Sequence, residues 1–215
     1  METISVLNDL TLFRSYARHI DLTFNQYLLA GGQPLLVHTG DTELAGRLAE
    51  RLIPALRGRP LSYIFISHFE SDECGGLLSW LNRFPEARPI CSEVTARQLG
   101  GFGMAKNAVV AKPGEVLETD SFRLEFIAYP SETHLWEGLI AFETRRKLLF
   151  SADLFIRRGT VGQAMRPLKW EEEIEGISPL QVPSPEARAV LQKSLKKLAV
   201  DFVAPGHGPF LRRAP

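Results

Sequence analysis

The chain has 215 residues, and its 25 basic and 25 acidic residues cancel to a formal net charge of zero. This balance, without a long run of one sign, argues against nucleic acid or an anionic membrane as the main partner. The chain has only two cysteines, no signal-peptide pattern and no apolar run near the roughly 18 residues of a membrane helix, so we expect a cytoplasmic protein without disulfides or membrane spans.

The first predicted elements are a hairpin and a helix within one domain that covers residues 1–215. Apolar, β-prone stretches at 22–29 and 34–38 flank a Gly-Gly-Gln-Pro turn, which predicts a β-hairpin. Leucines at helical spacing then follow a polar residue at 41 or 42 that is suited to an N-cap. Pro54 lies late in this pattern and should end or kink the helix.

Strands and helices continue to alternate along the rest of the chain. The pattern predicts strands at 61–66, 88–91, 116–119, 121–128, 139–143, 147–151 and 201–204, and helices at 77–81, 93–99 and 186–198. Residues 154–183 show no regular pattern and are expected to be irregular, as a lid, a plain surface loop or an oligomer contact. Antiparallel-looking strand pairs with interspersed helices predict an α/β (α+β) fold of two mixed sheets with helices outside.

A cluster of metal-ligand side chains follows the predicted strand 61–66. His68, Glu70 and Asp72 alternate with other residues in the stretch I-S-H-F-E-S-D-E-C-G-G, and a turn at the strand end would let all three side chains gather around one point. Imidazole and carboxylate together form a donor set that suits Zn, Fe or Mn. Gly75 and Gly76 should give the backbone freedom to turn into the next helix. Taken alone, the stretch is equally typical of a solvated polar loop.

Three more potential ligands occupy similar places, because His134, Asp153 and His207 each lie beyond an apolar, strand-like run. The H-x-E-x-D motif at 68–72, followed in order by His134, the segment Leu-Phe-Ser-Ala-Asp at 149–153 and the segment Ala-Pro-Gly-His-Gly-Pro at 204–209, resembles the metallo-β-lactamase superfamily. Within that superfamily, it is most similar to the metal-binding domain of flavodiiron proteins, since the hydrolases carry H-x-H-x-D-H at the first motif.

The resemblance implies an αββα sandwich with a carboxylate-bridged pair of iron ions between the sheet edges. The implied ligands are His68, Glu70 and His134 for one iron, Asp72 and His207 for the other, and Asp153 as the bridge. It also implies a non-haem diiron protein that binds O2, NO or peroxide. Such a protein acts either as an oxygen sensor or carrier, or as an O2/NO reductase that takes electrons from a separate protein. The last motif is close to Pro215, so we expect a chain without the flavodoxin domain and its FMN, as in stand-alone oxygen-binding diiron proteins.

Several alternatives stay open at this point. A binuclear zinc hydrolase of esters, thioesters or phosphoesters would fit the fold, but Glu70 argues against it because these enzymes usually place histidine there. A sensory module with a signalling partner is a third function, and a homodimer is neither required nor excluded. Glu73 stands where many superfamily members have a ligand histidine; we expect it beside the ligands or facing solvent rather than on the second metal.

Other residues near these motifs allow two interpretations each. His38 either orients a ligand or is a hydrogen-bonded histidine of the core. Cys74 is expected to be a buried small residue rather than a redox thiol. Trp136 and Trp170 fit equally well in the wall of a metal pocket and in ordinary aromatic packing.

Overall fold

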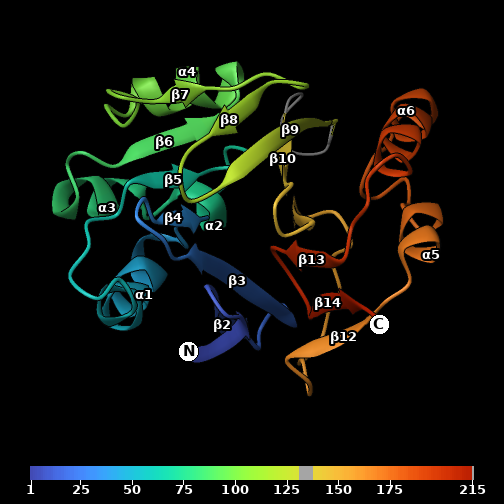
Figure 1. Cartoon of the computed structure of the whole chain (residues 1–215), viewed down its shortest axis with the longest axis horizontal. Coiled ribbons are helices and arrows are strands. Elements are labelled where there is room, and N and C mark those ends of the chain that lie inside the picture. The colour runs from blue at the N-terminus through green and yellow to red at the C-terminus, as the bar shows by residue number, and fades with distance from the viewer. Residues whose placement is uncertain (131–137, 215) are drawn as a thin grey trace.

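The computed structural model, which describes residues 1–130 and 138–214, contains two seven-stranded sheets (Figure 1). The first sheet follows chain order: β1 (Glu2–Leu7), β2 (Leu10–Ala17), β3 (Leu22–Leu29), β4 (Leu35–Val37), β5 (Tyr63–Phe65), β6 (Arg88–Cys91) and β7 (Val109–Val110). Its pairs are antiparallel from β1 to β4 and parallel from β4 to β7. The predicted hairpin at 22–38 is confirmed by the antiparallel pairing of β3 with β4.

The second sheet contains the later strands in a crossed order. From edge to edge it runs β12 (Met165–Leu168), β14 (Phe210–Arg213), β13 (Phe202–Pro205), β11 (Leu148–Ala152), β10 (Gly138–Glu143), β9 (Arg123–Tyr129) and β8 (Val116–Glu118). The pairs β11–β13 and β12–β14 are parallel, and the other neighbours are antiparallel. Both sheets are therefore mixed, as the strand pattern predicts.

Helices cover the outer face of each sheet. They are α1 (Thr42–Ala55), α2 (Ser71–Cys74), α3 (Leu77–Arg83), α4 (Glu93–Gly101), α5 (Trp170–Glu175) and α6 (Pro185–Leu195). Figure 1 shows α1 and α3 on one side of the molecule and α5 and α6 on the other. Three apolar clusters fill the spaces between these layers: one between the sheets, one under α1, α3 and α4, and one under α5 and α6. The layers are those of the predicted αββα sandwich.

Local sequence accounts for the best-defined helix starts. Asp41 caps α1 by accepting a hydrogen bond from the Leu44 amide, and Ser92 caps α4 by accepting one from the Thr95 amide. Pro54 occupies the last turn of α1, and the helix ends one residue later, as expected of proline at that place.

The expectation of an irregular 154–183 segment is wrong in part, because β12 and α5 lie within it. Two of the four residues of β12 are exposed, and the strand is held by parallel pairing with β14. Its sequence therefore shows little alternation of apolar and polar residues from which a strand could be predicted. The helix α5 buries Trp170 and Ile174. The Trp170 ring packs edge-on against Phe155, with ring centroids 5.9 Å apart, which identifies this tryptophan as core packing. Trp136 lies outside the described residues.

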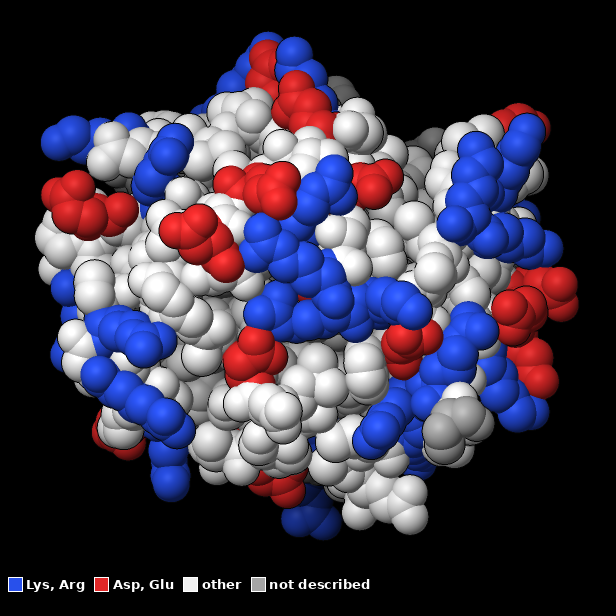
Figure 2. All heavy atoms as spheres, in the orientation of Figure 1, with Lys and Arg blue, Asp and Glu red and all other residues white. Residues whose placement is uncertain are grey.

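The surface mixes charges of both signs. On the face shown in Figure 2, basic and acidic side chains are interspersed, with a basic band across the middle. Among the described residues, none of the helices is both long enough and apolar enough to cross a lipid bilayer.

Candidate metal centre

Five of the six predicted ligands converge at the loops that follow neighbouring strands of the two sheets. His68 follows β5, and Glu70 and Asp72 come directly after it, at the start of and within α2. Asp153 follows β11, and His207 lies between β13 and β14. His134, the sixth predicted ligand, lies outside the described residues.

One group of donor atoms surrounds the His68 imidazole. Its Nε2 is 3.0 Å from a Glu70 carboxylate oxygen and 3.5 Å from Asp153 Oδ2. Ligands that share an ion with bonds of about 2.0–2.2 Å lie about 3 Å from one another. The spacing of these three side chains therefore suits a single cation between them.

A second group surrounds the His207 imidazole. Its Nε2 is 3.3 Å from Asp72 Oδ2 and also 3.3 Å from Asp153 Oδ1. The two oxygens of Asp153 thus face different histidines, one in each group. This is the arrangement that a carboxylate needs in order to bridge two ions.

Glu73 lies inside the cluster, which contradicts the solvent-facing interpretation of this residue. Only 1 % of it is exposed, and one of its carboxylate oxygens is 3.8 Å from His68 Nε2. The donor atoms of Glu73 lie within 4.8 Å of those of His68 and Glu70, and likewise of those of Asp72 and His207. The sequence could not show this, because α2 is a single turn whose orientation depends on the packing of the surrounding loops.

The electrostatics of the cluster require positive charge. Burial and the neighbouring carboxylates of Asp72 and Asp153 raise the pKa of Glu73 well above its usual range. Burial alone would raise the pKa of Asp153, but the adjacent imidazoles of His207 and His68 lower it to about 2. Within the described residues, the ion-pair partners of Asp72, Glu73 and Asp153 are histidines and never lysine or arginine.

Two buried oxygens support the same conclusion. Asp153 Oδ1 and Glu73 Oε2 are buried acceptors without a hydrogen-bond donor in the described part of the chain. A buried carboxylate without a donor or a cation is strongly unfavourable. Since all the donors are nitrogen and oxygen, the residues present fit a pair of metal cations of intermediate to hard character.

The loop that carries Asp72 and Glu73 is pinned by Thr39. The Thr39 amide and hydroxyl both donate to the Glu73 carbonyl, at 2.9 and 3.0 Å. Gly75 and Gly76 serve a purpose different from the expected backbone freedom, because both have ordinary helical φ values of −60° and −83°. A Cβ at these positions would lie 2.4 Å from the Ser71 carbonyl oxygen and 2.5 Å from the Ala45 side chain, so only glycine allows this close packing.

His38 faces Glu73 rather than one of the predicted ligands. Its ring lies parallel to Phe65, and its Nδ1 is 3.8 Å from Glu73 Oε1, which is beyond hydrogen-bond range. Burial lowers the pKa of His38 to about 3, so the ring is neutral at physiological pH. Its backbone adopts a left-handed φ of 63°, an uncommon conformation for a non-glycine residue, which turns the chain at the end of β4.

Strand β3 of the first sheet holds the His207 loop of the second. His207 Nδ1 lies 2.8 Å from the Thr23 carbonyl, and donation there leaves Nε2 free to face the carboxylates. Asn25 Nδ2 donates to the carbonyls of Pro205 and Gly208, at 3.0 and 2.8 Å. Neither Thr23 nor Asn25 was singled out from the sequence, and the adjacent polar pair Asn25-Gln26 in an apolar strand was the signal available.

Replacing Asn25 by alanine is therefore expected to lower the free energy of unfolding by about 2–3 kcal/mol, because the Gly208 carbonyl loses this donor, the Pro205 carbonyl keeps only the Tyr27 hydroxyl, and the buried Arg14 loses an acceptor. Urea denaturation of metal-free protein would measure the change. The matched control is Tyr27→Phe, which removes one hydroxyl bond to the Pro205 carbonyl, keeps the ring and should cost about 1 kcal/mol. An Asn25→Ala protein as stable as the wild type would show that this side chain does not hold the loop.

Both cysteines are buried, in agreement with the structural interpretation of Cys74. Burial raises the pKa of each thiol to about 12. About one thiol in ten thousand is then ionised at pH 8, so native protein should resist alkylation by iodoacetamide for hours. Protein in urea should react fully at both positions and provides the control. Rapid labelling of Cys74 in native protein would instead favour a redox thiol.

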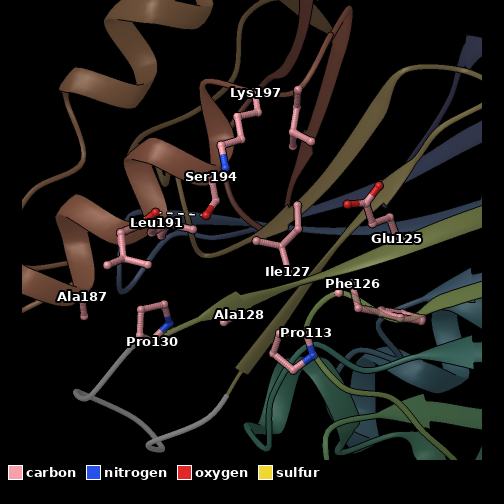
Figure 3. Close-up of a pocket in the computed structure, with 13 residues that line it drawn as sticks. Pro113, Glu125, Phe126, Ile127, Ala128, Pro130, Ala187, Leu191, Ser194 and Lys197 are labelled. Atoms are coloured by element: carbon pink, nitrogen blue, oxygen red, sulfur yellow. Dashed lines mark hydrogen bonds between the residues drawn. The ribbon is translucent and has the colours of Figure 1, made fainter.

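An apolar groove lies apart from the cluster, between β9 and α6 (Figure 3). Ile127 and Ala128 of β9 and Leu191 of α6 line it, and Lys197 lies at one end. None of the five converging ligands lines this groove. The candidate chemistry therefore belongs to the loops at the sheet edge and not to the groove.

Comparison with known proteins identifies the family of this chain and the fold that it shares with solved structures. The family model described as "ODP family beta lactamase" matches residues 22–208. The putative diflavin flavoprotein A 1 of Thermosynechococcus vestitus is 28% identical over 201 residues, which cover 88% of this chain and 34% of that protein. The anaerobic nitric oxide reductase flavorubredoxin of Aeromonas hydrophila is 25% identical over 143 residues, which cover 65% of this chain and 29% of that protein.

Among solved structures, the metal-soaked Flv1 flavodiiron core from Synechocystis sp. PCC6803 superimposes with a TM-score of 0.82. The match covers 98% of this chain and 57% of that one at 22% identity. At this identity, the likeness establishes the sandwich fold alone. The chain spans about a third of the length of the curated relatives it matches.

Proposed function

Because the chain belongs to the ODP family of beta lactamases, we propose that its clustered histidines and carboxylates hold two iron ions and that the protein binds O2 or NO. The observation that carries the proposal is Asp153, whose two oxygens face His68 and His207 at 3.5 and 3.3 Å. The similarity to a nitric oxide reductase flavorubredoxin supports the same class of chemistry.

The donor set supports iron over zinc. Glu70, Asp72, Glu73 and Asp153 place four carboxylates around two described histidines. Hard anionic oxygens stabilise Fe(II) and Fe(III) better than a histidine-rich site does. A binuclear zinc hydrolase remains the alternative, and Glu70 at 3.0 Å from His68 Nε2 is the feature against it.

Individual residues of the cluster would have different roles in this function. Two bound irons would supply the electrons that a diatomic gas accepts when it is reduced. Asp153 spans the two positions, and the Thr23 carbonyl fixes the orientation of the His207 ring. His68, Glu73 and His207 are buried, and burial strengthens the electrostatic interactions between them.

The source of electrons decides between two roles. With an electron-donor protein, the centre would work as an O2 or NO reductase, an oxidoreductase activity. Without one, it would bind the gas and act as a sensor or carrier. We favour the reductase with a separate donor, since reductases are found among the relatives.

Metal analysis of anaerobically purified protein, followed by its visible spectrum as air is admitted, tests the proposal. We expect about two irons per chain and a new charge-transfer band on oxygenation. Two zincs with a silent spectrum, together with turnover of generic thioesters or phosphodiesters, would replace the proposal by the hydrolase. Stopped-flow oxidation with and without a reduced flavoprotein donor would then separate the reductase from the sensor.

A further inference from the structure

The carboxylate of Glu73 is close to both halves of the described cluster. Its donor atoms lie near those of His68 and Glu70 in one group and near those of Asp72 and His207 in the other, so Glu73 joins the two groups, as Asp153 does. In each group all donor atoms lie within 4.8 Å of one another. The carboxylate is therefore within reach of both groups from α2, whereas Asp153 reaches them from the loop after β11.

Protein contacts do not account for the charge of Glu73. The residue is 1 % exposed, so water does not solvate it, and Oε2 has no hydrogen-bond donor among residues 1–130 and 138–214. The two nearest nitrogens, His38 Nδ1 and His68 Nε2, both lie 3.8 Å away, which is too far for a hydrogen bond. Burying a carboxylate in this way is strongly unfavourable unless a cation compensates it.

The backbone holds Glu73 in this place independently of its side chain. Thr39 donates twice to the Glu73 carbonyl, and the close packing of Gly75 and Gly76 fixes the turn that follows. The loop therefore directs the carboxylate into the cluster through the hydrogen bonds and packing of its backbone. A side chain held in this way by its backbone is preorganised for a ligand.

We propose that Glu73 is itself a metal ligand that would join the two groups from α2, in addition to Asp153. This inference rests on the binuclear centre proposed above. A carboxylate at this position gives the centre one more hard, negatively charged oxygen ligand than a neutral side chain would. The added negative charge would favour the higher oxidation state of each ion.

The test compares the wild type with Glu73→Gln and Glu73→Leu, each loaded with Fe(II) under anaerobic conditions and separately with Zn(II). Metal content is measured after dialysis, release is timed with excess chelator, and the unfolding temperature is recorded without metal. We expect both variants to release both ions at least about tenfold faster than the wild type. We also expect both to unfold at a higher temperature than the wild type when metal-free, because they lack an acidic group whose ionisation is opposed by burial and by the neighbouring carboxylates.

Glu143→Gln is the matched control. Glu143 is another fully buried glutamate, but its carboxylate accepts hydrogen bonds from the Arg123 and Arg146 amides, far from the ligands. This variant should lose stability and keep wild-type release rates. The opposite signs of the stability changes separate loss of a ligand from general damage to the core.

Three results would overturn the proposal. Release of both ions at the wild-type rate from Glu73→Gln would show that Glu73 is not a ligand. Metal-free variants that are less stable than the wild type, or that fail to fold, would also count against the proposal. Either result is what one expects if Glu73 stabilises the fold instead of binding metal. Wild-type protein that retains fewer than two ions would instead refute the binuclear centre itself, whatever the variants do.

Discussion

Replacing Asp153 by alanine is expected to abolish retention of both metal ions, with affinity at least about 100-fold below that of the wild type. Its two oxygens face the His68 and His207 groups, so a single deletion removes a ligand from each ion position. Metal analysis after dialysis against a chelator would fall from about two ions per chain to nearly none. Glu73 would still reach both groups from α2, but it does not replace the two oxygens that Asp153 supplies from the loop after β11.

Two comparisons make this result specific. Asp201→Ala removes an exposed carboxylate that pairs with Lys147, and it should leave the metal content unchanged. His68→Ala removes a donor from one group and should mainly weaken one ion. A soluble Asp153→Ala protein that keeps both ions would refute the bridging role of this residue. Loss of both ions from His68→Ala would show that the two positions are not independent.

The largest expected loss of stability comes from Phe150→Ala, at about 3–5 kcal/mol. Phe150 is 1 % exposed in the cluster between the sheets, where its ring lies edge-on to Tyr27 with centroids 6.0 Å apart. Removing the ring leaves a cavity that two rigid sheets cannot close. Urea denaturation of the metal-free protein measures the effect without a contribution from bound ions.

Phe102→Ala is the control for that measurement. The residue is 66% exposed, although it stacks on Phe69, and its removal should cost less than about 1 kcal/mol. Equal losses for the two variants would show that the space between the sheets is not the main source of stability.

The sequence predicts the elements whose residues alternate or repeat clearly. The α1 stripe, its Asp41 cap and the β3–β4 hairpin are all confirmed. The strands β1, β2, β7 and β14 have no counterpart among the predicted elements, and β12 and α5 lie in a segment expected to be irregular. The two residues of β7 and the four residues each of β12 and β14 are too few to show a pattern of their own, so these strands are defined by the neighbours that pair with them. Length does not explain the omission of β1 and β2, which have six and eight residues.

The candidate site shows the same division. His68, Glu70, Asp72, Asp153 and His207 are predicted from a motif order, and the structure brings them together; their role as ligands remains a prediction, as does that of His134. The burial of Glu73 and the support from Asn25 depend on tertiary packing, because each is set by residues far away in the chain. The spacing of the motifs identifies which side chains could donate an atom to a metal ion. It does not show which of the carboxylates is buried without a hydrogen-bond donor.

The hydrogen bonds from β3 to the His207 loop also have a kinetic consequence. Asn25 and Gly208 are 183 positions apart, and contacts of such long range form late, because closing a long loop costs entropy before any contact rewards it. Donor atoms on α2 could meet early, but the second group is complete only when the two sheets have joined. If the proposed centre binds metal, its uptake during refolding should therefore lag behind the formation of each sheet, and a loaded centre would mark a chain whose assembly is finished.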